Sequence, residues 1–125
     1  MYQPKLKKDI RCPLEYGLDV FGGKLNSRVI CVLAAKKTLH YSNLRDEMGN
    51  ITDSILSSTL KSLISNGIVM RIQYNEIPPH VEYKLTAKGE SLIPILLQIY
   101  KWSGAYFKPD INENAVHCQK CDYTN

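Results

Sequence analysis

The sequence of 125 residues has no long hydrophobic run. No apolar stretch approaches the roughly 20 residues that a helix needs to cross a bilayer, so no transmembrane helix is predicted. Residues 1–9 carry charge but no apolar core, so we expect no signal peptide and a cytoplasmic location. Phosphate-binding glycine loops, metalloprotease motifs and nucleophile–base pairs are also missing, so we expect neither an enzyme nor a cofactor.

An excess of charge of one sign is also lacking, since the net charge is only +4. A mildly basic protein of this kind is compatible with nucleic-acid binding, which the charge alone does not establish. The charge is uneven, because residues 1–37 carry eight basic and three acidic side chains, whereas residues 38–125 carry eight and nine. We therefore expect phosphate contacts mainly from the N-terminal third.

Helical patterns occupy the first half of the chain. Pro13 suits the first turn of a helix that runs to about Phe21 and stops at two glycines. A second helix, with Ser27 as a candidate N-cap, ends near Lys36. Ser42 is a candidate cap for a short helix over residues 43–48.

A fourth helix begins at Thr52 and ends at Asn66-Gly67, where glycine favours a C-cap. Its apolar residues are spaced as one helical face that packs on the core. They are Ile55, Leu56, Leu60, Leu63 and Ile64.

The second half predicts a hairpin and a long helix. Alternating residues over 68–74 and 81–85 indicate two strands, and the loop 75–80 contains two prolines that cannot continue a sheet. Thr86 caps a last helix that runs to about Tyr106 and is expected to bend at Pro94.

This order predicts an α+β fold, mainly α, of the winged helix-turn-helix type, with a two-stranded wing. We divide the chain into a basic arm (1–11), a DNA-binding and dimerisation domain (12–108) and a polar tail (109–125). The candidate contacts to duplex DNA are polar residues of the short helix, the fourth helix and the wing. They are Ser42, Thr52, Asp53, Ser54, Ser57, Ser58, Lys61, Arg71 and His80.

Three segments carry a family resemblance: residues 12–24, 39–69 and 74–89, of which the last contains Pro78-Pro79 before Val-Glu-Tyr. They resemble the HxlR family of bacterial and archaeal regulators, relatives of the MarR group. The resemblance implies a transcriptional regulator, repressor or activator, whose first and last helices pair two subunits. Two departures stand out: Leu25 replaces the family's usual Trp, and His80 replaces an Arg in the wing.

Four cysteines are present, and without a secretory segment a disulfide framework is not expected. Cys12 stands just before a predicted helix N-terminus, beside Arg11, where positive charge favours a reactive thiolate. In several members of the HxlR family the matching cysteine senses oxidants or electrophiles, whereas an incidental thiol is the alternative here. Cys118 and Cys121 lie beside His117, three weak candidate ligands for a metal.

The apolar residues of the last helix cover more than one face, which favours burial against a second copy of the chain. Three alternatives stay open. The winged helix could bind a protein instead of DNA, the Cys118–Cys121 pair could act as a thiol-redox centre, and the basic arm could be a solvated tail. The operator and the effector are not encoded in any recognisable motif.

Overall fold

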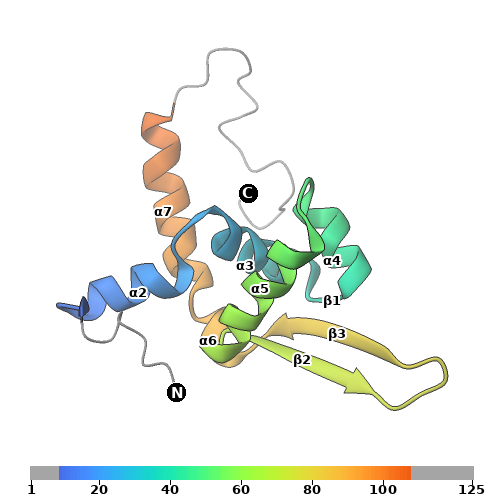
Figure 1. Cartoon of the computed structure of the whole chain (residues 1–125). Helices are drawn as coiled ribbons and strands as arrows, with labels where there is room; N and C mark the ends of the chain where they lie inside the picture. The colour runs from blue at the N-terminus through green and yellow to red at the C-terminus, as the bar shows by residue number, and fades with distance from the viewer. Residues whose placement is uncertain (1–8, 108–125) are drawn as a thin grey trace.

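A computed structural model describes residues 9–107, which form a helical layer packed against one face of a small antiparallel sheet (Figure 1). In chain order, the elements are α2 (Pro13–Phe21), α3 (Lys24–Lys36), β1 (Thr38–His40), α4 (Tyr41–Met48), α5 (Asp53–Ser65), β2 (Val69–Tyr74), β3 (His80–Leu85), α6 (Ala87–Glu90) and α7 (Ile93–Tyr106). The predicted fold class, winged helix-turn-helix, is confirmed.

The core lies between α3, α4, α5 and the roots of the strands. Most of its fully buried side chains come from helices whose apolar residues recur every three or four positions, and Ile68 and Val69 come from the start of the hairpin. Each such side chain stabilises the fold by about 1.5–3 kcal/mol. The largest are Val29, Ile30, Leu33, Leu44, Met48, Leu56, Leu63, Ile68 and Val69.

The sheet has three strands in the order β1-β3-β2, both pairs antiparallel. The predicted hairpin is β2–β3, in which Val69 faces Leu85 and Tyr74 faces His80. Strand β1 was not predicted, because three residues are too short to show a periodic pattern. In Figure 1 the hairpin projects to one side of the helical layer, while α2 and α7 project to the opposite side.

Two predicted helix starts are wrong. Helix α3 begins at Lys24, and the Ser27 hydroxyl donates backwards to the carbonyl oxygens of Gly23 and Lys24 instead of capping it. Gly23 has φ +82°, so the chain turns from α2 into α3 at this residue. Helix α4 begins at Tyr41 with no side-chain cap, which places Ser42 inside the helix.

The predicted long last helix is two helices. Thr86 caps the first, α6, by accepting a hydrogen bond from the Gly89 N–H at 3.0 Å, as expected. Helix α6 ends at Glu90. Pro94 stands in the first turn of α7, where proline costs no helical hydrogen bond. The proline therefore starts a new helix, and the prediction of a bend within one helix is wrong.

Candidate nucleic-acid interface

Helix α5 has a buried side and an exposed polar side. Its N-cap is Thr52, whose hydroxyl accepts from the Ile55 N–H at 3.2 Å. Leu56, Leu60 and Leu63 are at most 3% exposed and hold the helix against the core. The residues exposed along the opposite side are Asp53, Ser54, Ser58, Lys61, Ser62 and Ser65.

The predicted contact set for α5 changes in detail. Ser62 and Ser65 join the exposed side, and the i, i+4 step from Ser58 would have found the first of them. Ser57 is only half exposed. Ile55 is 46% exposed, so the prediction that it faces the core is wrong.

Side chains of α4 hold the start of α5 in place. Arg45 Nε lies 2.8 Å from Asp53 Oδ1, and its Nη2 donates to the Ile51 carbonyl oxygen at 3.3 Å. The Tyr41 hydroxyl donates to the same Asp53 carboxylate at 3.1 Å. Asp53 therefore joins the two helices of the helix-turn-helix, and sequence patterns gave no sign of this role for Tyr41 and Arg45.

The two predicted wing contacts lie on opposite faces of the hairpin. Residues that face each other across antiparallel strands share a face, and successive residues alternate. Arg71 pairs with Tyr83 on the face whose root, Val69, is in the core. His80 pairs with Tyr74 on the other face, so the structure does not bring Arg71 and His80 together.

His80 belongs to a cluster of titratable groups on that outer face. Its Nδ1 lies 3.0 Å from Glu76 Oε1, its ring stacks on Tyr74 at 4.5 Å, and its Nε2 lies 4.0 Å from Glu82. His40 of β1 also approaches Glu82, at 3.7 Å. Hydrogen bonding to Glu82, and the negative charge of that carboxylate, raise the pKa of Tyr74 above its ordinary value of 10.0.

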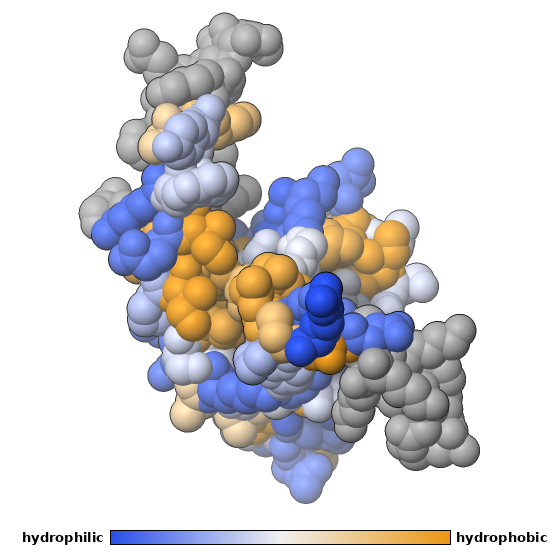
Figure 2. Space-filling model, turned by 90° about the vertical axis from the view of Figure 1, so that its left-hand side faces the viewer, coloured by the Kyte–Doolittle hydropathy of each residue, from blue (hydrophilic) through white to orange (hydrophobic). Residues whose placement is uncertain are grey.

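An apolar face covers α2 and α7 on the side away from the wing. Figure 2 shows hydrophobic side chains gathered at the centre of this side of the molecule. Seven large side chains of this face are each 43% to 71% exposed. A contiguous apolar patch of this kind is typical of a surface that binds a partner. The seven side chains belong to Leu14, Tyr16, Leu18, Ile95, Ile99, Trp102 and Tyr106.

Lys88 of α6 connects this apolar face with α5. Its Nζ donates to the Tyr16 hydroxyl of α2 at 3.0 Å and to the Asn66 carbonyl oxygen at 2.8 Å. Asn66 is the C-cap of α5. One ammonium group thus joins the first helix to the end of α5.

Cys12 is an exposed, free thiol at the N-cap of α2. Its carbonyl oxygen accepts from the Glu15 N–H at 3.0 Å, and the Glu15 carboxylate accepts from the Arg11 backbone N–H at 2.8 Å. Cys31 is half-buried in α3.

The candidate ligands His117, Cys118 and Cys121 lie outside the described residues, and within residues 9–107 no group of three or more His, Cys, Asp or Glu could hold a metal. No helix in this same range is long and apolar enough to cross a membrane.

Comparison with known proteins confirms the family. The model of the HxlR-like helix-turn-helix matches residues 20–111. The chain belongs to the HxlR-like helix-turn-helix family. This HxlR-like protein is therefore a DNA-binding transcriptional regulator. It is 39% identical over 101 residues to an HTH-type regulator, BH0655 of Halalkalibacterium halodurans, covering 81% of this chain and 89% of that protein. It is also 39% identical over 108 residues to YkvN of Bacillus subtilis, covering 85% and 89%.

Solved structures agree with the fold. The redox regulator HypR in its oxidised form is 35% identical and superposes with a TM-score of 0.66, covering 78% of this chain and all of HypR. The reduced form of the transcriptional regulator YodB from B. subtilis is 28% identical with a TM-score of 0.72, covering 80% and 98%. The structure of the HTH-type regulator ytcD is 35% identical with a TM-score of 0.71, covering 76% and 96%.

Proposed function

We propose that this HxlR-like regulator binds duplex DNA as a homodimer, with the exposed polar side of α5 in the major groove. The observation that carries the proposal is the division of α5 into a buried apolar side and a side of short hydroxyls with one lysine. Short side chains allow the helix to approach base edges closely, and Lys61 can bind a phosphate or guanine acceptors. Arg71, on the helix-side face of the wing, then contacts the neighbouring backbone.

Binding to an operator selected from random duplexes tests this proposal, with fluorescence anisotropy at several salt concentrations. We expect Lys61→Ala to weaken binding and to reduce the slope of log affinity against log salt by about one. Ser58→Ala should lower discrimination between bases by about 1–3 kcal/mol. Lys101→Ala, on exposed α7, is the matched control and should change neither quantity.

Unchanged operator affinity in the Lys61 variant would refute the role of α5. Absence of salt-dependent binding to any duplex would instead favour the alternative, a winged helix that binds another protein.

The second subunit is proposed to pack on the apolar face of α2 and α7. Helices α2 and α7 lie on the side opposite the hairpin, so a second copy packed there would leave the wing free for DNA (Figure 1). A two-fold axis through this apolar face would present two α5 helices to one face of the duplex. Half-sites one helical turn apart, about 34–36 Å, are the spacing that such dimers read.

We also propose that Cys12 senses oxidants, an inference supported by its exposure and by the redox regulator HypR among the similar structures. The Cys12 thiolate would take an oxygen from a hydroperoxide, giving a sulfenic acid and releasing the alcohol or water. A second thiol would then displace water to form a disulfide. Because Cys12 stands at the N-cap position of α2 and Tyr16 of α2 is bound by Lys88, a movement of α2 would reach the C-cap of α5.

The test compares Cys12→Ser with the wild type for operator binding before and after a hydroperoxide. We expect the oxidant to change the affinity of the wild type and to leave the variant unaffected. Alkylation rates followed by mass spectrometry should rank Cys12 above the half-buried Cys31. Release of the Cys12→Ser protein by oxidant would assign sensing to another thiol.

A further inference from the structure

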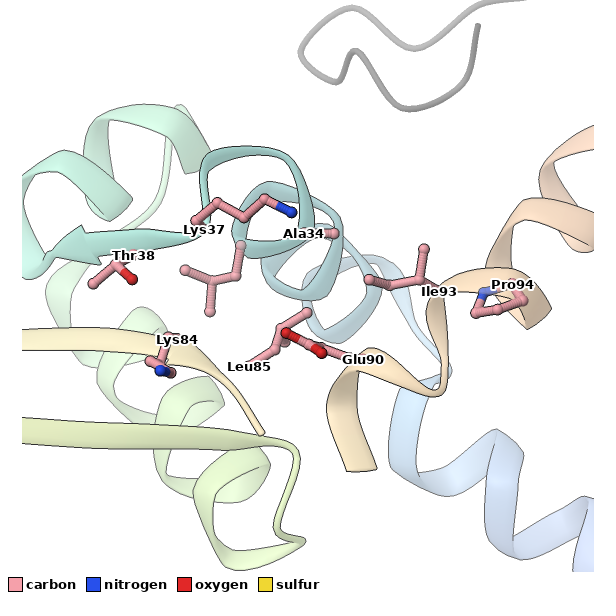
Figure 3. A pocket seen from close by; sticks show the side chains of 9 residues that line it. Ala34, Lys37, Thr38, Lys84, Leu85, Glu90, Ile93 and Pro94 are labelled. Carbon is pink, nitrogen blue, oxygen red and sulfur yellow. The ribbon is translucent and has the colours of Figure 1, made fainter. Parts of the chain in front are cut away.

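A cavity of about 480 Å³ lies where the end of α3, the sheet and the α6–α7 junction meet (Figure 3). This volume is in the range of small-molecule sites, and the lining offers both polar and apolar surface. The lining combines an apolar floor with charged side chains at the rim. It consists of Leu33, Ala34, Lys37, Thr38, Lys84, Leu85, Glu90, Ile93 and Pro94.

Three charged side chains in this cavity lack partners among residues 9–107. Lys37, Lys84 and Glu90 make no ion pair and no side-chain hydrogen bond with another described residue. Figure 3 shows Lys37 extending along the end of α3 towards Ala34, and the Glu90 carboxylate directed towards Leu85. The two ammonium groups outnumber the carboxylate, so the cavity favours an anion.

The backbone of Lys37 is strained. It has φ +75° and ψ −73°, the region of a rare γ-turn, and it is the only non-glycine residue with positive φ in the described part of the chain. Its N–H donates to the Leu33 carbonyl oxygen at 2.9 Å, so it is the C-cap of α3, a position where glycine is usual. Lysine at this position keeps a strained backbone and places an ammonium group on the cavity.

We propose that this cavity binds a small organic anion with an apolar body, such as an arylalkanoate, and that the ligand regulates DNA binding. The acid group lies against Lys37 and Lys84, and the apolar body lies over Leu33 and Ile93. Glu90 accepts a hydrogen bond when the ligand carries a hydroxyl or amine. A bare inorganic anion would leave the apolar floor unused.

The position of the cavity provides the regulatory effect. Lys84 belongs to β3 of the wing, Lys37 to the end of α3, and Ile93 to the start of α7. A molecule that touches all three fixes the wing and the α7 face relative to each other. Binding at the cavity stands without the proposed function, whereas its effect on DNA rests on it.

The experiment titrates the full chain with benzoate, phenylacetate and 3-phenylpropionate by calorimetry, with phenylacetamide and inorganic phosphate as controls. We expect saturable binding of at least one acid with a dissociation constant of about 1 mM or lower. The amide and phosphate should bind at least tenfold more weakly. Amide NMR signals of Thr38, Lys84 and Glu90 should shift on saturation.

Variants separate binding from folding. Lys37→Gly relieves the positive φ, so its thermal midpoint should stay the same or rise, while the acid binds about 10- to 100-fold more weakly. Lys84→Met should weaken the acid similarly. Lys36→Ala, exposed at the end of α3 and absent from the cavity lining, is the matched control and should bind as the wild type does.

Three results would overturn the proposal: no acid saturates, the amide or phosphate binds equally well, or Lys37→Gly binds as the wild type does. Saturable binding with unchanged operator affinity would remove the regulatory half alone. A protein that binds no DNA would refute the proposed function while the titration still decides the cavity.

Discussion

Trp102→Ala is the sharpest test of the proposed dimer face on α2 and α7. Trp102 is 68% exposed in the single subunit, and the centre of its ring lies 5.4 Å from that of Tyr106. A side chain so open contributes little to the core of one subunit. We therefore expect the substitution to weaken the dimer and to leave the subunit folded.

The magnitude follows from the area that the ring leaves open. An aromatic side chain buries about 150–250 Å² when fully covered, so 68% exposure leaves about 100–170 Å². Covering half of it at about 25 cal/mol/Å² contributes about 1.3–2.1 kcal/mol in each subunit. Since two-fold symmetry counts the residue twice, the total is about 2.5–4 kcal/mol, a 10²–10³-fold weaker dimer.

Sedimentation equilibrium measures this dissociation constant directly, and circular dichroism checks the fold. Ile77→Ala is the control, because Ile77 is 100% exposed at the wing tip and lies off the apolar face. The reasoning is refuted if the wild type is a monomer at about 10 μM. It is equally refuted if the Trp102 variant dimerises with unchanged affinity.

Three further predictions concern the recognition unit. Arg45→Met removes the ion pair with Asp53, and because both side chains are largely exposed we expect chemical denaturation to show a loss of only about 0.5–1 kcal/mol, with a larger loss of operator affinity. Gly67→Ala puts a side chain at φ +74°, where its Cβ would make an ordinary contact with Lys88 Cδ at 3.8 Å, so the backbone strain should appear in urea unfolding as a cost of about 1 kcal/mol. The hydrogen bond to Glu82 raises the pKa of Tyr74, so the stabilisation that it gives is complete below pH 10 and is lost only at higher pH. The absorbance of the Tyr74 phenolate should therefore titrate above pH 10.0, and Glu82→Gln should lower that midpoint.

Sequence reasoning worked where one local rule decides the outcome. Thr86 was predicted as a cap and Thr52 as the start of a helix, and the hydroxyl of each accepts an otherwise unpaired backbone N–H at the N-cap. Glycine after a helix predicted the end of α5, and Gly67 indeed has positive φ. The alternation of apolar and polar residues predicted the β2–β3 hairpin, because successive side chains of a strand point to opposite faces.

The rest depends on contacts between segments far apart in the chain. Nothing local to Arg45 indicates that it meets Asp53, and nothing local to Lys88 indicates that it meets Tyr16, 72 residues earlier. Ile55 fits the apolar spacing of α5, yet it is 46% exposed because its neighbours cover it only in part. The cavity at the end of α3 likewise forms only when α3, β3 and α7 are brought together.

The exposed side of α5 carries little positive charge, so the affinity that a second subunit would add matters for DNA binding. Each phosphate contact adds only about 0.9 to the salt slope, and α5 presents a single lysine, so this helix by itself supplies little electrostatic affinity for DNA. Glu76 and Glu82 on the outer face of the wing oppose phosphate further. In the proposed dimer, two subunits that engage two half-sites together gain affinity, because the second contact is made at high effective concentration. A signal that moves α2 or the α6–α7 junction would act on that combined affinity, because in the proposed dimer it would change the spacing of the two α5 helices.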